Sequence, residues 1–298
     1  MTGEPLVSVL TPSLSQARWL GDALGSVARQ TYPRIEQIVM DGGSTDGSVA
    51  LLRAASPRVR WRSEPDRGQS HALNKAFAES EGEIIGWLNA DDAYFAPDTV
   101  SEVTQLFARR PDVAVVYGHA ALVNGDGLIL HMIWAPPFNA PLLRLHNFII
   151  QPTAFIRRSA LGATLVDEAY ESAMDRELWL RLDHRCRFAR LDRVLAIDRH
   201  HPGRKVYTRP DLARAEGERL VAAYGVPSGD WSRAKLKVCK IAFRLAGLRL
   251  VPQASRTPLA FDGRVDGVWR LARRQLAAPR ATMPVGSASL PYPERATP

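Results

Sequence analysis

The chain has 298 residues, 46% of them apolar, and a formal net charge of +8. This length and apolar content predict one large domain with a real core, or a domain with an appendage. The two cysteines, Cys186 and Cys239, are too few for a disulfide framework and lack metal-site spacing, so we expect a reducing compartment. The first residues do not resemble a signal peptide, and no uninterrupted apolar run reaches spanning length. We therefore expect a cytoplasmic protein.

The positive charge is concentrated near the C-terminal end. Residues 231–298 hold 13 Lys+Arg and 3 Asp+Glu, a net charge of +10, which leaves −2 for residues 1–230. From about residue 278 onward Pro, Ala, Ser and Thr dominate, and this composition predicts disorder. We expect a main domain over 1–227, a basic helical extension over 228–277 and a disordered tail over 278–298.

Strand and helix patterns alternate through the first 92 residues. Short apolar runs typical of buried strands lie at 6–10, 35–40, 59–61 and 84–88. Stretches with helical apolar spacing separate these runs, and we expect Thr45 or Asp46 to cap the second helix and Ser70 the third. The alternation predicts an α/β fold with a mostly parallel sheet flanked by helices.

The pattern changes beyond a helix near 98–109. Two strands are expected at 113–117 and 120–123, and a turn signal precedes a further strand at 128–130. Residues 134–152 give no clear prediction. We expect a helix at 177–182 and a strand at 194–197, and Ser232 is expected to cap a helix that ends near residue 250.

Polar residues follow three of the predicted strands. These segments are Thr11-Pro12-Ser13, Asp41-Gly42-Gly43-Ser44 and Asn89-Ala90-Asp91-Asp92. The carboxyl ends of parallel strands meet at one sheet edge, where open α/β folds bind ligands. Two adjacent carboxylates repel each other, and Mg²⁺ or Mn²⁺ with a bound phosphate would relieve the repulsion. From the local sequence alone, a solvated turn explains Asp91-Asp92 equally well.

Three further positions have both a functional and a simpler interpretation. Arg67 precedes the helix that contains Asn74 and could face a phosphate or ribose, but the local sequence alone favours an ordinary surface arginine beside a helix cap. Asp175 is a candidate acid at a helix start, where the helix dipole by itself favours a carboxylate. His201 either binds a metal or lies exposed in a Pro-Gly turn. The chain contains neither a dinucleotide fingerprint nor a P-loop.

Taken together, these segments resemble the family 2 glycosyltransferases of the GT-A fold over roughly residues 5–205. The resemblance rests on ordered agreement at the following segments: 7–13, 30–33, 41–47, 72–75, 87–92, Asp175 with 177–181, and 199–203.

The resemblance implies an inverting transfer of a sugar from a nucleotide-diphosphate sugar to an acceptor hydroxyl, and the donor that we expect from it is a UDP-sugar. It implies Mn²⁺ or Mg²⁺ held by Asp91, Asp92 and His201, with Asp175 as the general base. Asn89 and Gly42 stand where many members carry Asp, which is a departure from the family pattern. The donor contacts that it implies are Thr11, Pro12, Ser13, Asp41, Ser44, Arg67, Asn74, Asn89, Ala90 and Asp91.

The acceptor expected from the resemblance is a saccharide or lipid-linked saccharide in polysaccharide or glycolipid synthesis. A different class of function is a non-catalytic protein that binds acidic polymers through the basic segment. That segment has no nucleic-acid motif and no aromatic stacking platform, so we expect no nucleic-acid partner. Retention of Asp91, Asp92 and Asp175 favours the enzyme over a relative that has lost catalysis.

The helix expected at 232–250 has a basic stripe beside an apolar stripe. The basic positions are Arg233, Lys237, Lys240 and Arg244, and the apolar ones are Ala234, Val238, Ile241, Leu245 and Leu248. The helix either packs its apolar stripe on the domain or lies on an anionic membrane surface. The second alternative predicts peripheral association with the cytoplasmic face of a membrane.

Overall fold

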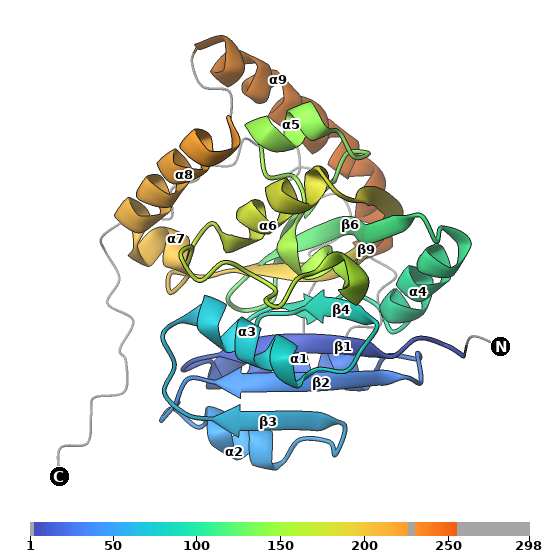
Figure 1. Cartoon of the computed structure of the whole chain (residues 1–298), viewed down its shortest axis with the longest axis vertical. Helices are drawn as coiled ribbons and strands as arrows, with labels where there is room; N and C mark the ends of the chain where they lie inside the picture. Colours follow the sequence, from blue (N-terminus) through green and yellow to red (C-terminus); the bar gives the residue numbers. More distant parts are fainter. Residues whose placement is uncertain (1–2, 226–229, 255–298) are drawn as a thin grey trace.

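The computed structural model describes residues 3–225 and 230–254. In these residues the strands form one mixed sheet in the order β3-β2-β1-β4-β8-β6-β9-β5, and β7 pairs with β6 (Figure 1). The strands are β1 (Val7–Ser13), β2 (Ile35–Asp41), β3 (Val59–Ser63), β4 (Ile84–Trp87), β5 (Ala93–Tyr94), β6 (Val113–Asn124), β7 (Ile129–Ile133), β8 (Phe155–Arg157) and β9 (Arg187–His200).

The two halves of the sheet differ in strand direction. β1 pairs in parallel with β2 and with β4, and β2 pairs in parallel with β3. Beyond β4 the sheet is mixed, since β8 runs antiparallel to both β4 and β6 while β6 and β9 are parallel. The predicted α/β class, with a mostly parallel sheet flanked by helices, is confirmed.

The helices cover both faces of the sheet and extend beyond its second half (Figure 1). They are α1 (Ala17–Ala28), α2 (Ser48–Arg53), α3 (Gln69–Glu79), α4 (Thr99–Arg109), α5 (Ala140–Leu145), α6 (Met174–Asp183), α7 (Lys205–Thr208), α8 (Pro210–Tyr224), α9 (Asp230–Gly247) and α10 (Val251–Ala254), with 3-10 turns η1 (Gln151–Thr153), η2 (Arg158–Ala160) and η3 (Leu248–Leu250). None of the helices in the described residues is long and apolar enough to cross a bilayer.

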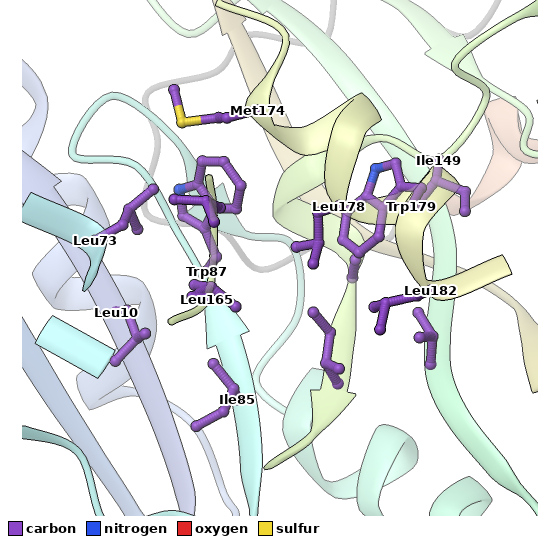
Figure 2. Packing of buried hydrophobic residues seen from close by; sticks show 14 of the residues in the cluster. Leu10, Leu73, Ile85, Trp87, Ile149, Leu165, Met174, Leu178, Trp179 and Leu182 are labelled. Carbon is purple, nitrogen blue, oxygen red and sulfur yellow. The ribbon is translucent and has the colours of Figure 1, made fainter. Parts of the chain in front are cut away.

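The buried core lies on both faces of the central strands. Ile85 and Trp87 of β4 pack into the cluster that includes Leu178 and Trp179 of α6 (Figure 2). Ile84, one position away, points into the cluster on the opposite face. A strand buried on both faces must be apolar throughout, which is why β4 is a continuous apolar run.

Several local predictions need correction. The two strands expected at 113–117 and 120–123 are one strand, β6, whose pairing with β9 shifts register around His119. Ser70 lies inside α3, where its hydroxyl donates to the Tyr170 carbonyl, and Gly68 occupies the cap position. Gly47, with φ of 103°, occupies the cap position of α2, although the Asp46 carboxylate accepts the Ser48 N–H at 3.1 Å. Ser232 lies within α9, which begins two residues earlier.

The basic helix packs on the body of the protein. α9 lies against β7, where Phe243 contacts Trp134 with ring centroids 5.6 Å apart. Leu250 and Val251 then enter a buried cluster shared with β5, β6 and β9. The helix therefore has a packed face on the sheet domain. Residues 255–277 of the expected extension and the tail expected at 278–298 lie outside the described residues.

Candidate active site

A cavity of about 480 Å³ opens at the carboxyl ends of β1 and β4. Its wall includes the end of β1, the segment after β4, the start of α3, the start of α6 and the segment from His201 into α7. The residues named from the sequence that line it are Pro12, Ser13, Asn89, Ala90, Asp91, Asp175 and His201. The prediction that polar strand ends meet in one cleft is thus confirmed for β1 and β4, which are neighbours in the sheet.

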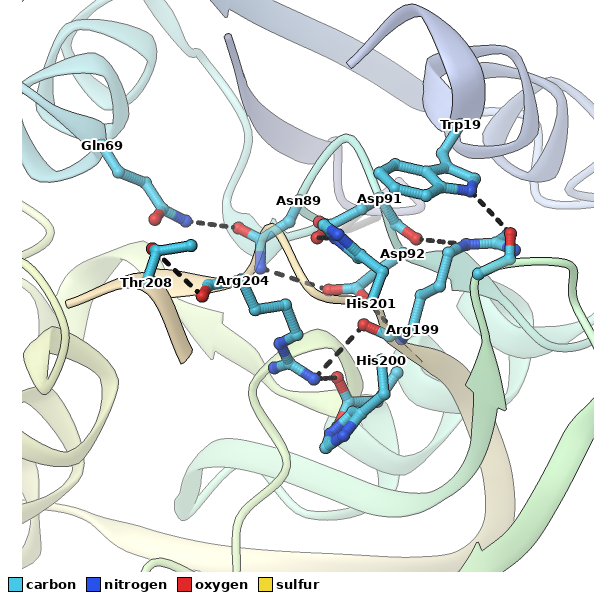
Figure 3. Close-up of polar contacts among 12 residues, drawn as sticks. Trp19, Gln69, Asn89, Asp91, Asp92, Arg199, His200, His201, Arg204 and Thr208 are labelled. Atoms are coloured by element: carbon cyan, nitrogen blue, oxygen red, sulfur yellow. Dashed lines mark hydrogen bonds and ion pairs between the residues drawn. The ribbon is translucent and has the colours of Figure 1, made fainter. Parts of the chain in front are cut away.

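Asp91 and His201 form a side-chain pair at one end of the cavity (Figure 3). The His201 Nε2 lies 3.0 Å from the Asp91 Oδ2, although 110 residues separate them in the sequence. The Trp19 ring lies against the imidazole, with ring centroids 4.0 Å apart. The Trp19 indole N–H donates to the Gly125 carbonyl at 2.8 Å, which fixes the ring. A fixed carboxylate and imidazole at a cavity wall suit a divalent cation.

Asp92 lies behind this pair rather than in the cavity wall. It is buried, its Oδ1 accepts the Arg199 backbone N–H at 3.0 Å, and its Oδ2 accepts the Asn89 side-chain N–H at 3.2 Å. Burial, with a smaller contribution from the neighbouring Asp91 and Asp198 charges, raises the pKa of Asp92 well above its usual value. These contacts favour a supporting role for Asp92 over direct contact with a metal.

Arg199 ties the Asp91–His201 end of the cavity to α1. Its guanidinium donates to the Asp91 carbonyl and to the Asp22 carboxylate, both at 2.8 Å, and the side chain is almost fully buried. The buried Arg199 side chain therefore holds the loop after β4 against the end of β9. We expect this anchor to keep Asp91 and His201 in register.

Asn89 uses all four hydrogen-bonding positions of its amide. Its oxygen accepts from Trp87 Nε1 at 2.8 Å and from Gln69 Nε2 at 2.7 Å. Its nitrogen donates to Gln151 Oε1 at 2.8 Å and to Asp92. A carboxylate could not donate these last two bonds and would repel the buried Asp92. An amide at this position departs from the family pattern, but it is the group that can bind all four of these hydrogen-bond partners.

Asp175 lies at the first turn of α6 and lines the cavity. Its Oδ2 accepts a hydrogen bond from Asn147 Nδ2 at 2.7 Å. Burial raises the pKa of Asp175 above its usual value, while this bond and the nearby Arg176 charge oppose the rise. A half-buried carboxylate of raised pKa that lines a cleft is a candidate general base.

Glu216 of α8 holds the segment that leads into Asp175. Its buried carboxylate accepts backbone N–H groups from Glu171, Ser172 and Ala173, each at 2.8 Å. Three charge-assisted bonds to consecutive residues leave that segment little freedom. Glu216 lies outside every motif in the sequence, and nothing in its local sequence marks it.

Three cations in the cavity wall follow directly after His201. Arg204 pairs with Asp198 at 2.8 Å, Arg209 pairs with Glu171 at 2.7 Å, and Lys205 donates to the Glu171 carbonyl at 3.2 Å. Burial lowers the pKa of Lys205. The sequence does contain a signal for these three residues, since Lys and Arg are frequent just after the segment 199–203. The prediction from motifs did not use this signal.

Other expected donor contacts have structural partners and do not belong to the cavity wall. Thr11 accepts from Gln37 at 3.0 Å, and Arg67 pairs with Glu168 at 2.8 Å. The Asn74 amide binds the backbone of 165–166. Their partners account for these residues without a ligand.

Asp41 and Ser44 shape the loop after β2. The Asp41 carboxylate accepts from the Gly43 and Ser44 backbone N–H groups and from the Ser44 and Ser63 hydroxyls. The Ser44 hydroxyl in turn accepts the Ser15 backbone N–H at 2.7 Å. Both residues therefore fix the loop after β1, where the cavity wall begins.

Two polar atoms of the cavity wall lack a hydrogen-bond partner within the protein. They are the Ser13 hydroxyl and the Gln16 side-chain oxygen, and both are buried. An unpartnered buried polar group is costly unless a ligand or water satisfies it. This end of the cavity is thus suited to a polar ligand.

Comparison with curated proteins identifies several glycosyltransferases. An uncharacterised glycosyltransferase of Mycobacterium tuberculosis is 37% identical over 120 residues, which cover 40% of this chain and 46% of that protein. The chondroitin synthase of Pasteurella multocida is 29% identical over 194 residues, covering 64% of this chain and 20% of that protein. The matched region thus spans less than half of the length of these two relatives.

Solved structures of low identity share the fold. S. aureus TarS in complex with UDP-GlcNAc superposes with a TM-score of 0.57 at 19% identity, covering 72% of this chain and 66% of that one. The mannosyltransferase PcManGT of Pyrobaculum calidifontis, in complex with GDP-Man and Mn²⁺, superposes with a TM-score of 0.57 at 20% identity, covering 85% of this chain and 74% of that one.

The family model described as glycosyl transferase family 2 matches residues 8–164, more than half of the chain. This span contains β1 to β4, the Asn89–Asp92 segment and the Asn147 partner of Asp175. The chain therefore belongs to glycosyl transferase family 2.

Proposed function

We propose that the protein transfers a sugar from a nucleotide-diphosphate sugar to an acceptor hydroxyl with inversion at the anomeric carbon. The observation that carries the proposal is the composition of one cavity wall. It combines the Asp91–His201 pair, three cations and the half-buried carboxylate of Asp175. Metal, diphosphate and acceptor proton each have a matching group there.

A divalent metal fits the Asp91–His201 pair. A carboxylate oxygen and an imidazole nitrogen lie 3.0 Å apart, and both atom types are ligands that a divalent cation accepts. No group of three or more candidate metal-ligating side chains occurs in the described part of the chain. Mg²⁺ and Mn²⁺ are commonly held by one or two side chains, with substrate phosphates and water as further ligands. Such a metal, when bound, neutralises charge on the leaving diphosphate.

Arg204, Lys205 and Arg209 are proposed to hold the diphosphate. Each has a partner in the protein, and two of these contacts involve Glu171. A diphosphate is a stronger partner for Lys205 and Arg209 than a single carboxylate or carbonyl. We expect donor binding to draw α7 toward the phosphates and to exchange these contacts for phosphate contacts.

Asp175 is proposed to accept the acceptor's proton. Of the other acids of the wall, Asp66 accepts the Gly68 N–H at 2.8 Å and Asp91 contacts His201, while Glu171 lies beside the Lys205 and Arg209 cations that are proposed to hold the diphosphate. Asp175 instead contacts the neutral Asn147 amide, and its raised pKa makes it a stronger base than an exposed aspartate.

The proposed reaction is one displacement. The acceptor oxygen forms a bond to the anomeric carbon, the bond from that carbon to the diphosphate oxygen breaks, and the proton passes to Asp175. The nucleoside diphosphate leaves with the bonding electron pair. No covalent sugar–enzyme intermediate is needed, so one carboxylate suffices, unlike in retaining hydrolases.

A UDP-sugar is our proposed donor and a saccharide or lipid-linked saccharide our proposed acceptor. The UDP-GlcNAc complex of TarS supports the first, and the relation to the chondroitin synthase supports a saccharide acceptor. The Ser13 hydroxyl and the Gln16 side-chain oxygen, which have no hydrogen-bond partner in the protein, lie in the wall of the same cavity and could form hydrogen bonds with the UDP-sugar.

A donor panel tests this proposal. The protein is mixed with UDP- and GDP-sugars and Mn²⁺, and thermal stabilisation and release of nucleoside diphosphate are measured. A matching donor at 100 times its Kd should stabilise the fold by about 2.7 kcal/mol. If no nucleotide sugar stabilises the protein, donor use is contradicted. A product that keeps the donor's anomeric configuration contradicts the single displacement but not donor use.

A further inference from the structure

The outer face of α9 exposes a row of large apolar side chains. Val238, Ile241 and Leu245 are 68%, 62% and 52% exposed, and they lie three and four residues apart. That spacing places them on one face of the helix, together with the exposed Ala234. We call these four residues the α9 ridge.

The α9 ridge is not the face that holds the helix in place. The half-buried Phe243 lies on the other side and contacts Trp134 of the segment after β7. The chain that follows is anchored by the buried Leu250 and Val251. The sequence left two alternatives for this helix: its apolar stripe packs on the domain, or the helix lies on an anionic membrane surface. The structure corrects the first, because the helix packs on the domain through another face while Val238, Ile241 and Leu245 of the stripe stay exposed.

The charges around the α9 ridge are mostly positive. Residues 230–254 contain six Lys or Arg and one acid, Asp230, at the first position of α9. Lys235, Lys237 and Lys240 of α9 are exposed, and Lys235 and Lys237 lie on either side of the ridge by helical spacing. An apolar row between lysines fits the boundary of a membrane, where acyl chains lie beneath anionic headgroups.

The same charges disfavour the other occupants of this face. A second copy docked ridge to ridge would bring two sets of lysines together. Residues 255–298 of this chain carry seven Lys or Arg and three Asp or Glu, so this segment is also basic. An anionic lipid surface complements both the charge and the apolar row.

We propose that the α9 ridge, with Lys235 and Lys237 beside it, docks this protein on an anionic membrane surface with α9 lying in the plane of the interface. The docked helix lies beside the base side of the cavity. Burial and the nearby Lys240 lower the pKa of His146 to about 4, and the next residue, Asn147, contacts Asp175. In Figure 1, α9 runs past α5, the helix that ends just before His146.

Vesicle flotation with the full-length chain tests this surface without donor or acceptor, so the result does not depend on the proposed transfer. Vesicles of phosphatidylcholine alone are compared with equimolar phosphatidylcholine and phosphatidylglycerol. We expect the wild-type protein to float with the anionic vesicles only and to detach in high salt.

Two sets of substitutions separate the apolar and the charged contributions. Val238→Gln, Ile241→Gln and Leu245→Gln together should abolish flotation, while Lys235→Gln with Lys237→Gln should weaken partitioning about 30-fold. The matched controls on α8 are Val221→Gln and Arg214→Gln, also at exposed positions, and both should float like the wild type. All these side chains are exposed, so an unchanged thermal midpoint checks that each variant folds.

Three outcomes would overturn the proposal. The wild-type chain might stay at the bottom of the gradient with anionic vesicles, or the triple glutamine variant might float as well as the wild type. A wild-type dimer in vesicle-free light scattering that becomes monomeric in the triple variant would assign the ridge to self-association instead.

Discussion

The parallel half of the sheet and the mixed half build opposite sides of the same cavity in different ways. In the first half, β1 and β4 are neighbouring parallel strands, so the residues that follow them meet at one edge. In the second half, Asp175 comes from a helix start and His201 from the end of the 14-residue β9. The side that contains Ser13, Asn89 and Asp91 thus follows from strand order. The side that contains Asp175 and His201 depends on contacts between distant segments.

The largest effect is expected from removing Asp91, whose contact with His201 joins the two halves. Asp91→Ala removes the carboxylate that contacts His201, and transfer should fall about 10⁴-fold, because a bound metal contributes several kcal/mol to stabilising the leaving charge. Folding should be preserved, because the change also removes a charge that repels Asp92. Initial rates and a melting curve measure both effects.

Asp126→Ala is the matched control, since Asp126 is an exposed acid paired with Arg18. It should retain wild-type rates. Undiminished turnover of the wild-type enzyme in excess chelator would contradict the metal-dependent role of Asp91.

Removal of the proposed base, Asp175, should slow transfer without changing donor binding. Asp175→Asn keeps the shape and the hydrogen bond from Asn147 but cannot accept a proton, so transfer should fall about 10²- to 10⁴-fold with donor binding unchanged. In the wild type, kcat/KM should fall as pH drops through the raised pKa of Asp175. Steady-state kinetics across pH provide the measurement.

The same variant should be more stable than the wild type at neutral pH. Burial raises the folded-state pKa of Asp175, so its ionised form opposes folding above that pKa. The stability gain of Asp175→Asn should grow as pH rises through the folded pKa and vanish below the pKa of an unfolded aspartate. Asp211→Asn, at the exposed start of α8, should show neither change. A destabilised Asp175→Asn at neutral pH would contradict the burial argument.

A smaller effect is expected from loosening the segment before Asp175. Glu216→Gln replaces one carboxylate oxygen by an amide NH₂, which cannot accept the hydrogen bonds that the wild-type carboxylate receives from the backbone N–H groups. We expect this loss to cost about 1–3 kcal/mol of stability. The value of kcat should fall about 10-fold while KM for the donor stays constant, because the base is misplaced and the donor contacts are not.

Glu218→Gln is the control, because Glu218 lies two residues further along α8 and is exposed. A merely structural role for Glu216 would lower stability and leave kcat of the folded enzyme unchanged. That result would remove the positioning role.

The smallest effect concerns the parallel half and its departure from the family pattern. Asn89→Asp places a carboxylate against Asp92 and removes the donor to Gln151, so we expect a loss of about 1–2 kcal/mol at neutral pH. The loss should shrink in mild acid as one of the two carboxyl groups is protonated. Denaturant unfolding at both pH values measures it. Asn124→Asp, where the side-chain oxygen only accepts, should be neutral; equal stability of Asn89→Asp and wild type would refute the account.

Much of the parallel half was predictable because its signals are local. The apolar run of β4 and the polar residues after it mark a buried strand and its end, and alternating helices imply that the strands are parallel. The same signals placed Ser13, Asn89 and Asp91 at one sheet edge before any contact was known.

The mixed half was less predictable because its signals are distant. β8 is three residues long and becomes a strand only between β4 and β6. The sequence predicted two strands at 113–117 and 120–123, whereas β6 is continuous and only its register with β9 shifts. The residues at 134–152 contain α5 and Asn147, whose roles depend on packing against α6.

The sequence by itself was enough to predict the fold class, the family, and Asp91, Asp175 and His201 as candidate site residues, because these predictions depend on local patterns of residue type. Only the tertiary structure decided which acids face the cavity. Asp92 is buried behind Asp91 because its oxygens pair with Arg199 and Asn89, which lie on other segments. Tertiary packing also decided that the α9 ridge faces outward, because the position of Trp134 fixes which side of the amphipathic helix is covered.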